Sequence, residues 1–306
     1  MPKLAILLCT FQGESFIRPQ LDSILAQTVD DWVMWVSDDG STDETIAILT
    51  DYSGKLGGEK LIITKGPARG FAANFFSLMF DPDISADYYA FADQDDIWEP
   101  HKLRIAIDEL ETIPDQTPAV YCSRTKLIDD SGKATGYSPL CKRLPGFNNA
   151  LVQNLASGNT MVFNNAARNL VRQSVVAPRV PYHDWWLYLL VSAAGGVVFY
   201  DNRATVRYRQ HDSNQIGINS NFQSYARRAR SFMRSDFRCL LKIHLAELDK
   251  RLDRVSTQNR QTLNLFKKFL NSNFISRVLK IKKLGLYRQN TLQTLVLNIV
   301  LLRIKI

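Results

Sequence analysis

Short apolar runs alternate with helical segments between residues 4 and 93 of this 306-residue chain. LAILLCT (4–10), KLIITKG (60–66) and YYAFA (88–92) have the length and composition of buried strands. Residues 16–28 and GFAANFFSLMF (70–80) show the apolar spacing of helices. Strand, helix and strand in succession predict a parallel sheet with helices on both faces, which is the doubly wound α/β arrangement.

Two expected strands end in acidic turns: DWVMWV (31–36) leads into SDDGSTD (37–43), and YYAFA leads into DQDD (93–96). Because the carboxyl ends of parallel strands share one edge of a sheet, both turns should lie at one rim. Asp38 could accept a hydrogen bond from a nucleobase or a ribose hydroxyl there, although an Asx turn is the alternative. Asp93 and Asp95 repel each other unless a cation lies between them, so they predict Mg²⁺ or Mn²⁺ shared with a diphosphate. A solvated acidic loop is the alternative for this second turn.

Two further segments carry titratable side chains. In YHDWWLYLL (182–190), Asp184 begins an apolar helix as a candidate proton acceptor, and His183 could ligate, donate or orient. VRYRQHDSN (206–214) suits a diphosphate leaving group and a metal, through Arg207, Arg209 and His211. Core tryptophans and a solvated strand face are the respective alternatives.

Charge divides the chain into two parts. Residues 1–222 hold 19 Lys and Arg against 26 Asp and Glu, whereas residues 223–306 hold 19 against 4. The second part is also helical in pattern, without clear strands. We therefore expect an acidic, cation-binding domain over 1–222, divided near residue 118 into a first half and a mixed-sheet half, followed by a basic helical region. The basic region favours an anionic partner, either membrane lipid or nucleic acid.

Targeting and redox signals are weak. Four cysteines show no paired or metal-binding spacing, which indicates free thiols in a reducing cytoplasm. The apolar run after Lys3 is short and lacks a cleavage pattern, so it reads as a strand rather than a signal peptide. TLVLNIVLL (294–302) is about half as long as a spanning helix. We expect a cytoplasmic protein that is not integral to a membrane.

The order of motifs over about residues 4–216 resembles that of family 2 glycosyltransferases of the GT-A fold, in particular bacterial rhamnosyltransferases of surface-polysaccharide assembly. The motifs are ILLCTFQGESFI, SDDGSTD, GFAANFF, FADQDDIW, SGNTMVFN, HDWW and YRQHDSN. The resemblance implies a Rossmann-like fold with a nucleotide-sugar half and an acceptor half. It also implies inverting transfer of a hexose from a dTDP- or UDP-linked donor, with dTDP-rhamnose foremost, to a saccharide or lipid-linked saccharide.

The resemblance further implies roles for individual residues. Asp184 would be the general base. The donor-binding set would be Thr10, Phe11, Glu14, Asp38, Asp93, Arg207 and Arg209. The metal ligands would be Asp93, Asp95 and His211. Beside these, and from their neighbourhood in the sequence alone, His183, Trp185, Asp96 and Trp98 are candidate acceptor-facing or supporting positions; the resemblance leaves the role of residue 183 open.

Two departures and two rival functions accompany this interpretation. His183 stands where many relatives have Glu, and a Gln-x-x-Arg-Trp motif of processive members is absent, which favours addition of single sugars. A nucleotidyltransferase is one rival, but CTFQGESF lacks its glycine-rich phosphate loop with Lys or Arg. The other is a non-catalytic module that binds membrane or nucleic acid; RNA-binding aromatic motifs are not visible, so we expect no nucleic-acid partner.

The basic region interleaves Lys and Arg with apolar residues in RRARSFMR (227–234), KKFLNSNFISRVLKIKKLGLYR (267–288) and LVLNIVLLRIKI (295–306). Helices of this kind can bury an apolar stripe at the lipid headgroups while their cations meet anionic lipid. We therefore expect peripheral association with the inner face of the cell membrane. Packing on the catalytic domain or on a second subunit of a homo-oligomer is the alternative.

Overall fold

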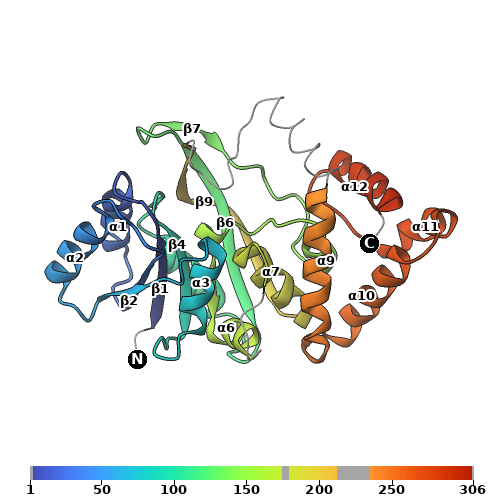
Figure 1. The fold of residues 1–306 in the computed structure, drawn as a ribbon, viewed down its shortest axis with the longest axis horizontal. Helices are drawn as coiled ribbons and strands as arrows, with labels where there is room; N and C mark the ends of the chain where they lie inside the picture. The colour runs from blue at the N-terminus through green and yellow to red at the C-terminus, as the bar shows by residue number, and fades with distance from the viewer. Residues whose placement is uncertain (1–2, 174–178, 212–234, 305–306) are drawn as a thin grey trace.

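The computed structural model describes residues 3–173, 179–211 and 235–304 (Figure 1). One nine-stranded sheet runs through it in the order β3-β2-β1-β4-β8-β6-β9-β5, with β7 paired to β6. The strands are β1 (Leu4–Thr10), β2 (Trp32–Asp38), β3 (Leu61–Lys65), β4 (Tyr88–Asp93), β5 (Ile97–Trp98), β6 (Ala119–Ile128), β7 (Ala134–Tyr137), β8 (Val162–Asn164) and β9 (Val197–Arg209).

The sheet is parallel in its first half and mixed in its second. β1 pairs in parallel with β2 and β4, and β2 with β3, as the alternation of strands and helices predicts. β8 then runs antiparallel between β4 and β6, while β6 and β9 are parallel to each other. The runs 196–201 and 206–211, which read as two strands in the sequence, belong largely to the single strand β9. The predicted mixed α/β fold is confirmed.

Helices cover both faces because alternate residues of the buried strands point to opposite sides. Leu4, Ile6 and Leu8 of β1 pack with one group of helices, and Ala5 and Leu7 with the other. The first group is α1 (Ile17–Leu25), α2 (Thr45–Leu56) and α4 (Lys102–Leu110). The second is α3 (Phe71–Phe80), α5 (Phe147–Ala150), α6 (Asn165–Arg172) and α7 (His183–Ala194).

The C-terminal part is helical, as expected, and lies beyond α7 at the end of the molecule away from α1 and α2 (Figure 1). Its helices are α9 (Ser235–Asp249), α10 (Thr257–Leu270), α11 (Phe274–Lys280) and α12 (Thr291–Arg303). Leu241, Leu263, Phe266 and Leu297 are buried in the same apolar core as α7. The segment 227–234 and the predicted boundary at residue 222 lie outside the described residues.

One buried cation joins three of these helices. The Arg277 guanidinium of α11 donates to the carbonyl oxygens of Ser272 at 3.0 Å and Leu301 at 3.1 Å, and also to those of Leu270 and Ile304. These carbonyls lie at the carboxyl ends of α10 and α12, where helices have unpaired acceptors. Arg277 therefore ties α10, α11 and α12 into one unit.

Two further expectations concern the whole chain. All four cysteines are free thiols, as their spacing predicts. Among the residues that the structure describes, no helix combines the length and the apolar character needed to cross a bilayer.

Candidate active site

The two acidic turns lie at the same rim of the sheet. In the parallel registers, Thr10 at the end of β1 is opposite Asp38 of β2, and the preceding Cys9 is opposite Asp93 of β4. The short 3-10 helix η1 (Gly158–Thr160) packs against β4, and the start of α7 reaches η1. The rim therefore gathers segments from both halves of the domain.

Hydrogen bonds saturate the carboxylate of the first turn. Asp38 Oδ1 accepts from the backbone N–H groups of Gly40 at 3.0 Å and Ser41 at 2.7 Å. Its Oδ2 accepts from the hydroxyls of Thr10 at 2.7 Å and Ser41 at 2.6 Å. Asp39 accepts from the backbone of Ala68 and Gly70, at 2.7 and 2.9 Å. The first turn is thus an Asx-type turn that also holds the loop before α3.

The predicted base-pocket residues follow β1 in a loop beside this turn. The ring of Phe11 is 56% exposed, while its backbone N–H and carbonyl bond to the Gln94 side chain at 2.8 and 2.9 Å. Glu14 Oε2 accepts from the backbone N–H of Glu44 at 3.0 Å. Phe11 therefore presents a free aromatic face at the rim, whereas Glu14 helps to hold the segment that leads into α2.

Asp93 and Asp95 of the second turn have few hydrogen-bond donors for their carboxylates among the described residues. Burial, together with repulsion from Asp95 and Asp184, raises the pKa of Asp93 to about 8. The Asp95 carboxylate lies 2.8 Å from Nε2 of His211, and this hydrogen bond raises the pKa of the imidazole. Asp95 and His211, two of the three predicted metal ligands, are thus in direct contact, and Asp95 is near enough to Asp93 to raise its pKa. In the described part of the chain no group of three His, Cys, Asp or Glu side chains is arranged to hold a metal ion.

This donor set fits a divalent cation that shares its ligands with a substrate. Mg²⁺ in phosphate-handling sites is commonly held by one or two carboxylates together with phosphate oxygens, rather than by a cage of protein ligands. Burial, and then the charges of Asp95 and Asp184, raise the pKa of Asp93, and a bound cation would offset both effects. Asp93, Asp95 and His211 are therefore suited to Mg²⁺ or Mn²⁺.

Buried side chains next to the second turn hold it in place. Asp96 is fully buried; its Oδ2 accepts from the Asn159 amide at 2.5 Å and its Oδ1 from the backbone N–H of Arg209 at 3.2 Å. Burial lowers the pKa of Lys102 to about 7, and its ammonium lies 3.6 Å from the centre of the buried Trp98 ring. Asp96 and Trp98 therefore support the turn and do not line the open rim.

The two arginines of β9 have different partners. Arg209 is buried; its guanidinium donates to the carbonyl of Asp95 at 3.0 Å and to those of residues 129 and 130, at 3.1 and 2.8 Å. Arg207 instead makes a bidentate ion pair with Glu99, with distances of 2.8 and 3.1 Å. Arg209 thus positions the metal-binding turn directly. The sequence-based expectation that both arginines contact the donor diphosphate is not tested by these bonds; the pairing with Glu99 favours a structural role for Arg207, and the diphosphate contact stays a prediction for Arg209.

Asp184 lies at the start of α7, within a cage of donors. Its Oδ1 accepts from the Trp185 backbone N–H at 2.6 Å, and its Oδ2 from the Asn154 amide at 2.9 Å and the Gly158 backbone N–H at 3.1 Å. Burial nevertheless raises the pKa of Asp184. Its charge also adds to the rise in the pKa of Asp93, after burial and Asp95, so the candidate base lies near one of the candidate metal ligands.

The two residues beside Asp184 serve as packing groups. His183 is buried, stacks on Phe75 with ring centres 3.9 Å apart and meets Phe91 edge-on at 4.7 Å. Burial lowers its pKa to about 3, and neither ring nitrogen has a hydrogen-bond partner among the described residues. Trp185 donates from Nε1 to the Ala150 carbonyl at 2.7 Å. His183 is therefore a neutral member of an aromatic cluster behind the rim.

Sequence reasoning missed the amides that orient these carboxylates. Asn154 bonds Asp184, Asn159 bonds Asp96, and Gln20 donates to the backbone carbonyl of Asp93 at 2.9 Å. The SGNT motif was the one available signal, for Asn159. Isolated Asn and Gln residues look like ordinary turn or surface residues until the fold brings them to their partners.

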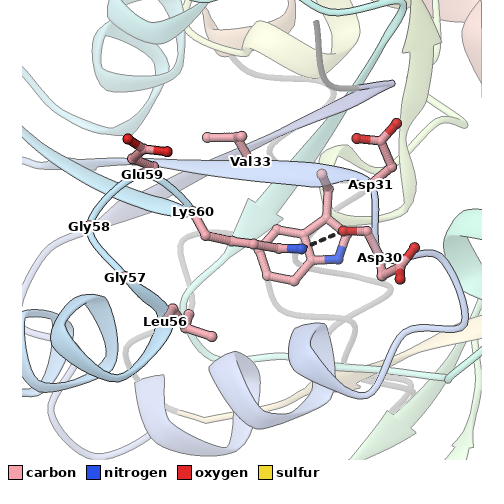
Figure 2. Close-up of a pocket in the computed structure, with 9 residues that line it drawn as sticks. Asp30, Asp31, Val33, Leu56, Gly57, Gly58, Glu59 and Lys60 are labelled. Carbon is pink, nitrogen blue, oxygen red and sulfur yellow. Dashed lines mark hydrogen bonds between the residues drawn. The ribbon is translucent and has the colours of Figure 1, made fainter.

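A separate surface hollow of about 650 Å³ lies at the other end of the strands (Figure 2). It is lined at the starts of β2 and β3 by residues that include Asp30, Trp32 and Lys60. Lys60 donates to the Asp30 carbonyl, and its ammonium lies 4.5 Å from the centre of the Trp32 ring. None of the predicted site residues lines this hollow, so it is not the candidate active site.

A mixed sheet with helices on both faces and paired carboxylates at the carboxyl ends of its parallel strands is the arrangement expected of a GT-A glycosyltransferase. The sequence pattern of glycosyl transferase family 2 matches residues 5–170, and the chain belongs to that family. It is 30% identical over 233 residues to a dTDP-rhamnosyl transferase, RfbG, of Shigella flexneri, which covers 72% of this chain and 77% of the relative. An uncharacterized glycosyltransferase of Rickettsia typhi is 24% identical over 223 residues, 69% of this chain and 65% of that one.

Solved structures show the same fold. Residues 1–349 of Staphylococcus aureus TarS in complex with UDP-GlcNAc match with a TM-score of 0.58 and 14% identity, over 85% of this chain and 70% of that one. The mannosyltransferase PcManGT of Pyrobaculum calidifontis, in complex with GDP-Man and Mn²⁺, matches with a TM-score of 0.54 and 14% identity, over 98% and 86%. The predicted GT-A fold and glycosyltransferase class are confirmed.

Proposed function

We propose that the chain transfers rhamnose from dTDP-rhamnose to a saccharide or lipid-linked saccharide during assembly of a bacterial surface polysaccharide. The transfer inverts the anomeric centre and adds one sugar at a time. The relationship to the Shigella flexneri dTDP-rhamnosyl transferase supports the donor. The missing Gln-x-x-Arg-Trp motif supports single additions. UDP-linked sugars are the alternative donors.

One observation supports the proposal: Asp184 is near enough to Asp93 to add, after burial and Asp95, to the rise in the pKa of Asp93. Glycosyl transfer needs a proton acceptor on one side of the anomeric carbon and stabilisation of a departing diphosphate on the other. A rim with both groups meets both needs.

Asp184 acts as the general base in this proposal. As the acceptor hydroxyl attacks the anomeric carbon, its proton passes to a carboxylate oxygen of Asp184. The Asn154 amide and the Gly158 N–H keep that carboxylate in one orientation, and burial raises its pKa toward the working pH, which favours proton acceptance. Attack from the side opposite the diphosphate inverts the anomeric configuration.

Asp93, Asp95 and His211 would hold the cation, and Arg209 fixes the backbone of Asp95. Mg²⁺ or Mn²⁺, when bound, would neutralise the charge that develops on the diphosphate. The exposed ring of Phe11 offers a stacking surface for the base of the donor, beside Thr10 and Asp38.

The test is a transfer assay with the purified full chain and dTDP-rhamnose, UDP-GlcNAc or GDP-mannose, with Mn²⁺, Mg²⁺ or excess chelator. We expect release of dTDP from dTDP-rhamnose that depends on an acceptor and on the metal, and a product of inverted anomeric configuration by NMR. Release of pyrophosphate would instead indicate a nucleotidyltransferase. Full activity in chelator would exclude the metal role, and the absence of any nucleotide-sugar binding would favour a non-catalytic protein.

A further inference from the structure

The outer side of α11 exposes an unusual amount of apolar surface. Phe274 is 60% exposed, Ile275 and Leu279 are each 73% exposed, and Val278 is 47% exposed. These side chains follow one another at helical spacing on a helix whose Arg277 points inward. Because a helix of a soluble protein normally turns such residues toward a core, this side of α11 lacks a packing partner among the residues that the structure describes.

The neighbouring helix α12 repeats the pattern. Leu292, Leu295 and Ile299 are exposed at spacings of three and four residues, whereas Leu297 and Leu301 are buried. Each helix therefore has an outward stripe as well as an inward one. We call the exposed residues of both helices the α11–α12 stripes: Phe274, Ile275, Val278, Leu279, Leu292, Leu295 and Ile299.

The sequence that carries the stripes has only positive charges. Residues 254–306 contain eleven Lys and Arg and no Asp or Glu. Lys280, Lys282 and Lys283 are exposed directly after the stripe of α11, and Arg303 is exposed at the end of α12. An occupant of this surface must therefore accept apolar side chains and carry negative charge.

We propose that the α11–α12 stripes dock the protein on an anionic phospholipid bilayer. Apolar side chains enter the headgroup boundary and the flanking lysines pair with lipid phosphates, which is how interfacial amphipathic helices bind. A second copy of the chain is disfavoured as occupant because two all-positive surfaces repel. Nucleic acid would match the charge and leave the apolar stripes uncovered.

The docked surface connects to the candidate base through the loop before η1. Gln153 Oε1 accepts from the backbone N–H of Gln289 at 2.9 Å, in the segment between α11 and α12. The Asn149 amide donates to the Tyr287 carbonyl at 2.9 Å. The residue after Gln153 is Asn154, which bonds Asp184. The proposed lipid-binding helices are therefore joined by hydrogen bonds to the loop that holds the candidate base Asp184.

The experiment is co-sedimentation of the full chain with phosphatidylcholine vesicles that contain or lack phosphatidylglycerol, at low and high salt. Wild-type binding should require phosphatidylglycerol and fall with salt. Ile275→Ser with Leu279→Ser should reduce binding by at least about tenfold. Lys282→Gln with Lys283→Gln should reduce it about fivefold per lysine. Point variants are preferred to deletion because α10, α11 and α12 also contribute buried side chains.

Matched controls are Ile46→Ser on α2 and Lys133→Gln, both at exposed positions away from the stripes. They should bind vesicles as the wild type does. Equal binding to neutral vesicles, no vesicle binding, or equal losses in the controls would each overturn the proposal. So would dimerisation that the Ile275→Ser, Leu279→Ser variant abolishes in the absence of lipid binding.

Transfer from dTDP-rhamnose to a water-soluble acceptor should be unchanged in the stripe variants. This readout separates the two proposals, because vesicle binding without sugar transfer would contradict only the proposed function. Sugar transfer without vesicle binding would contradict only the docking surface.

Discussion

The two acidic turns at the rim look alike in the sequence and differ in the structure. Asp38 accepts four hydrogen bonds and thereby builds its own turn. Asp95 has the His211 imidazole as its partner, and Asp93 has a raised pKa. A carboxylate surrounded by donors is already stabilised, whereas crowded carboxylates with few donors are poised for a cation. The distribution of hydrogen-bond donors therefore distinguishes a first turn with a structural role from a second turn suited to binding a cation.

The largest expected effect comes from the second turn. Asp95→Ala should reduce sugar transfer to background while leaving the unfolding free energy nearly unchanged, because it removes a ligand and opens no core cavity. Transfer rates and urea unfolding curves of the same preparation measure both. An Asp95→Ala protein with substantial transfer activity would show that the cation is held elsewhere.

Asp184→Asn tests whether the base belongs to the same site. The amide keeps the shape and loses the proton acceptor, so the transfer rate should fall about 10²–10⁴-fold while binding of dTDP persists. Single-turnover kinetics and calorimetric binding of dTDP separate the two quantities. A near wild-type rate would place the base on another residue.

Asp38→Ala, unlike Asp95→Ala, should lower the stability of the folded chain. The loss of four accepted hydrogen bonds, some with buried donors, should lower the unfolding free energy by about 2–4 kcal/mol. Urea denaturation measures this, with Asp95→Ala as the matched control. If Asp38→Ala were as stable as the control, the contrast between the two turns would be wrong.

Asp93→Asn sharpens the contrast through pH. The pKa of Asp93 rises from 3.8 to about 8 in the folded chain, so the folded state binds the proton more tightly than the unfolded state does. Stability of the metal-free protein should therefore fall as the pH rises from about 4 to about 8, and Asp93→Asn should remove that part of the slope. Tm values in chelator at pH 5 and pH 8 should show the variant a few degrees above wild type at pH 8. Parallel Tm profiles would contradict the assignment.

The smallest effect should come from Arg207, at the edge of the second turn. Its ion pair with Glu99 is partly exposed, so Arg207→Ala should cost about 0–1 kcal/mol of unfolding free energy. The KM for the donor should change little, in contrast to Arg209→Ala. A tenfold rise in that KM would show that Arg207 leaves Glu99 to bind the diphosphate.

The sequence predicts the first half of the sheet well because its signals are local. The strand 4–10 matches β1 to the residue, and 88–92 matches β4 within one residue. The two-residue β5 has no such signal, since pairing with β9 defines it. That pairing explains why Glu99, next in the chain, meets Arg207.

The sequence indicates which residue types lie at the rim, but not which hydrogen-bond donors each carboxylate receives. Carboxylates at strand ends indicated the rim, where Asp95 contacts His211 and the charges of Asp95 and Asp184 act on Asp93. The catalytic and metal-binding roles of these residues stay predictions. Which donors each carboxylate receives depends on long-range contacts such as that between Asn154 and Asp184. The tertiary fold decides these contacts, and no local pattern encodes them.

The buried Arg277 has a consequence for how the molecule moves. Its guanidinium bonds to carbonyls of α10 and α12 at once, so none of these helix ends can open without leaving a buried cation unsatisfied. Backbone amides of the three helices should therefore exchange with solvent as one cooperative unit rather than fray one by one. If the α11–α12 stripes dock on a bilayer as proposed, the three helices would follow the orientation of the bilayer together rather than separately.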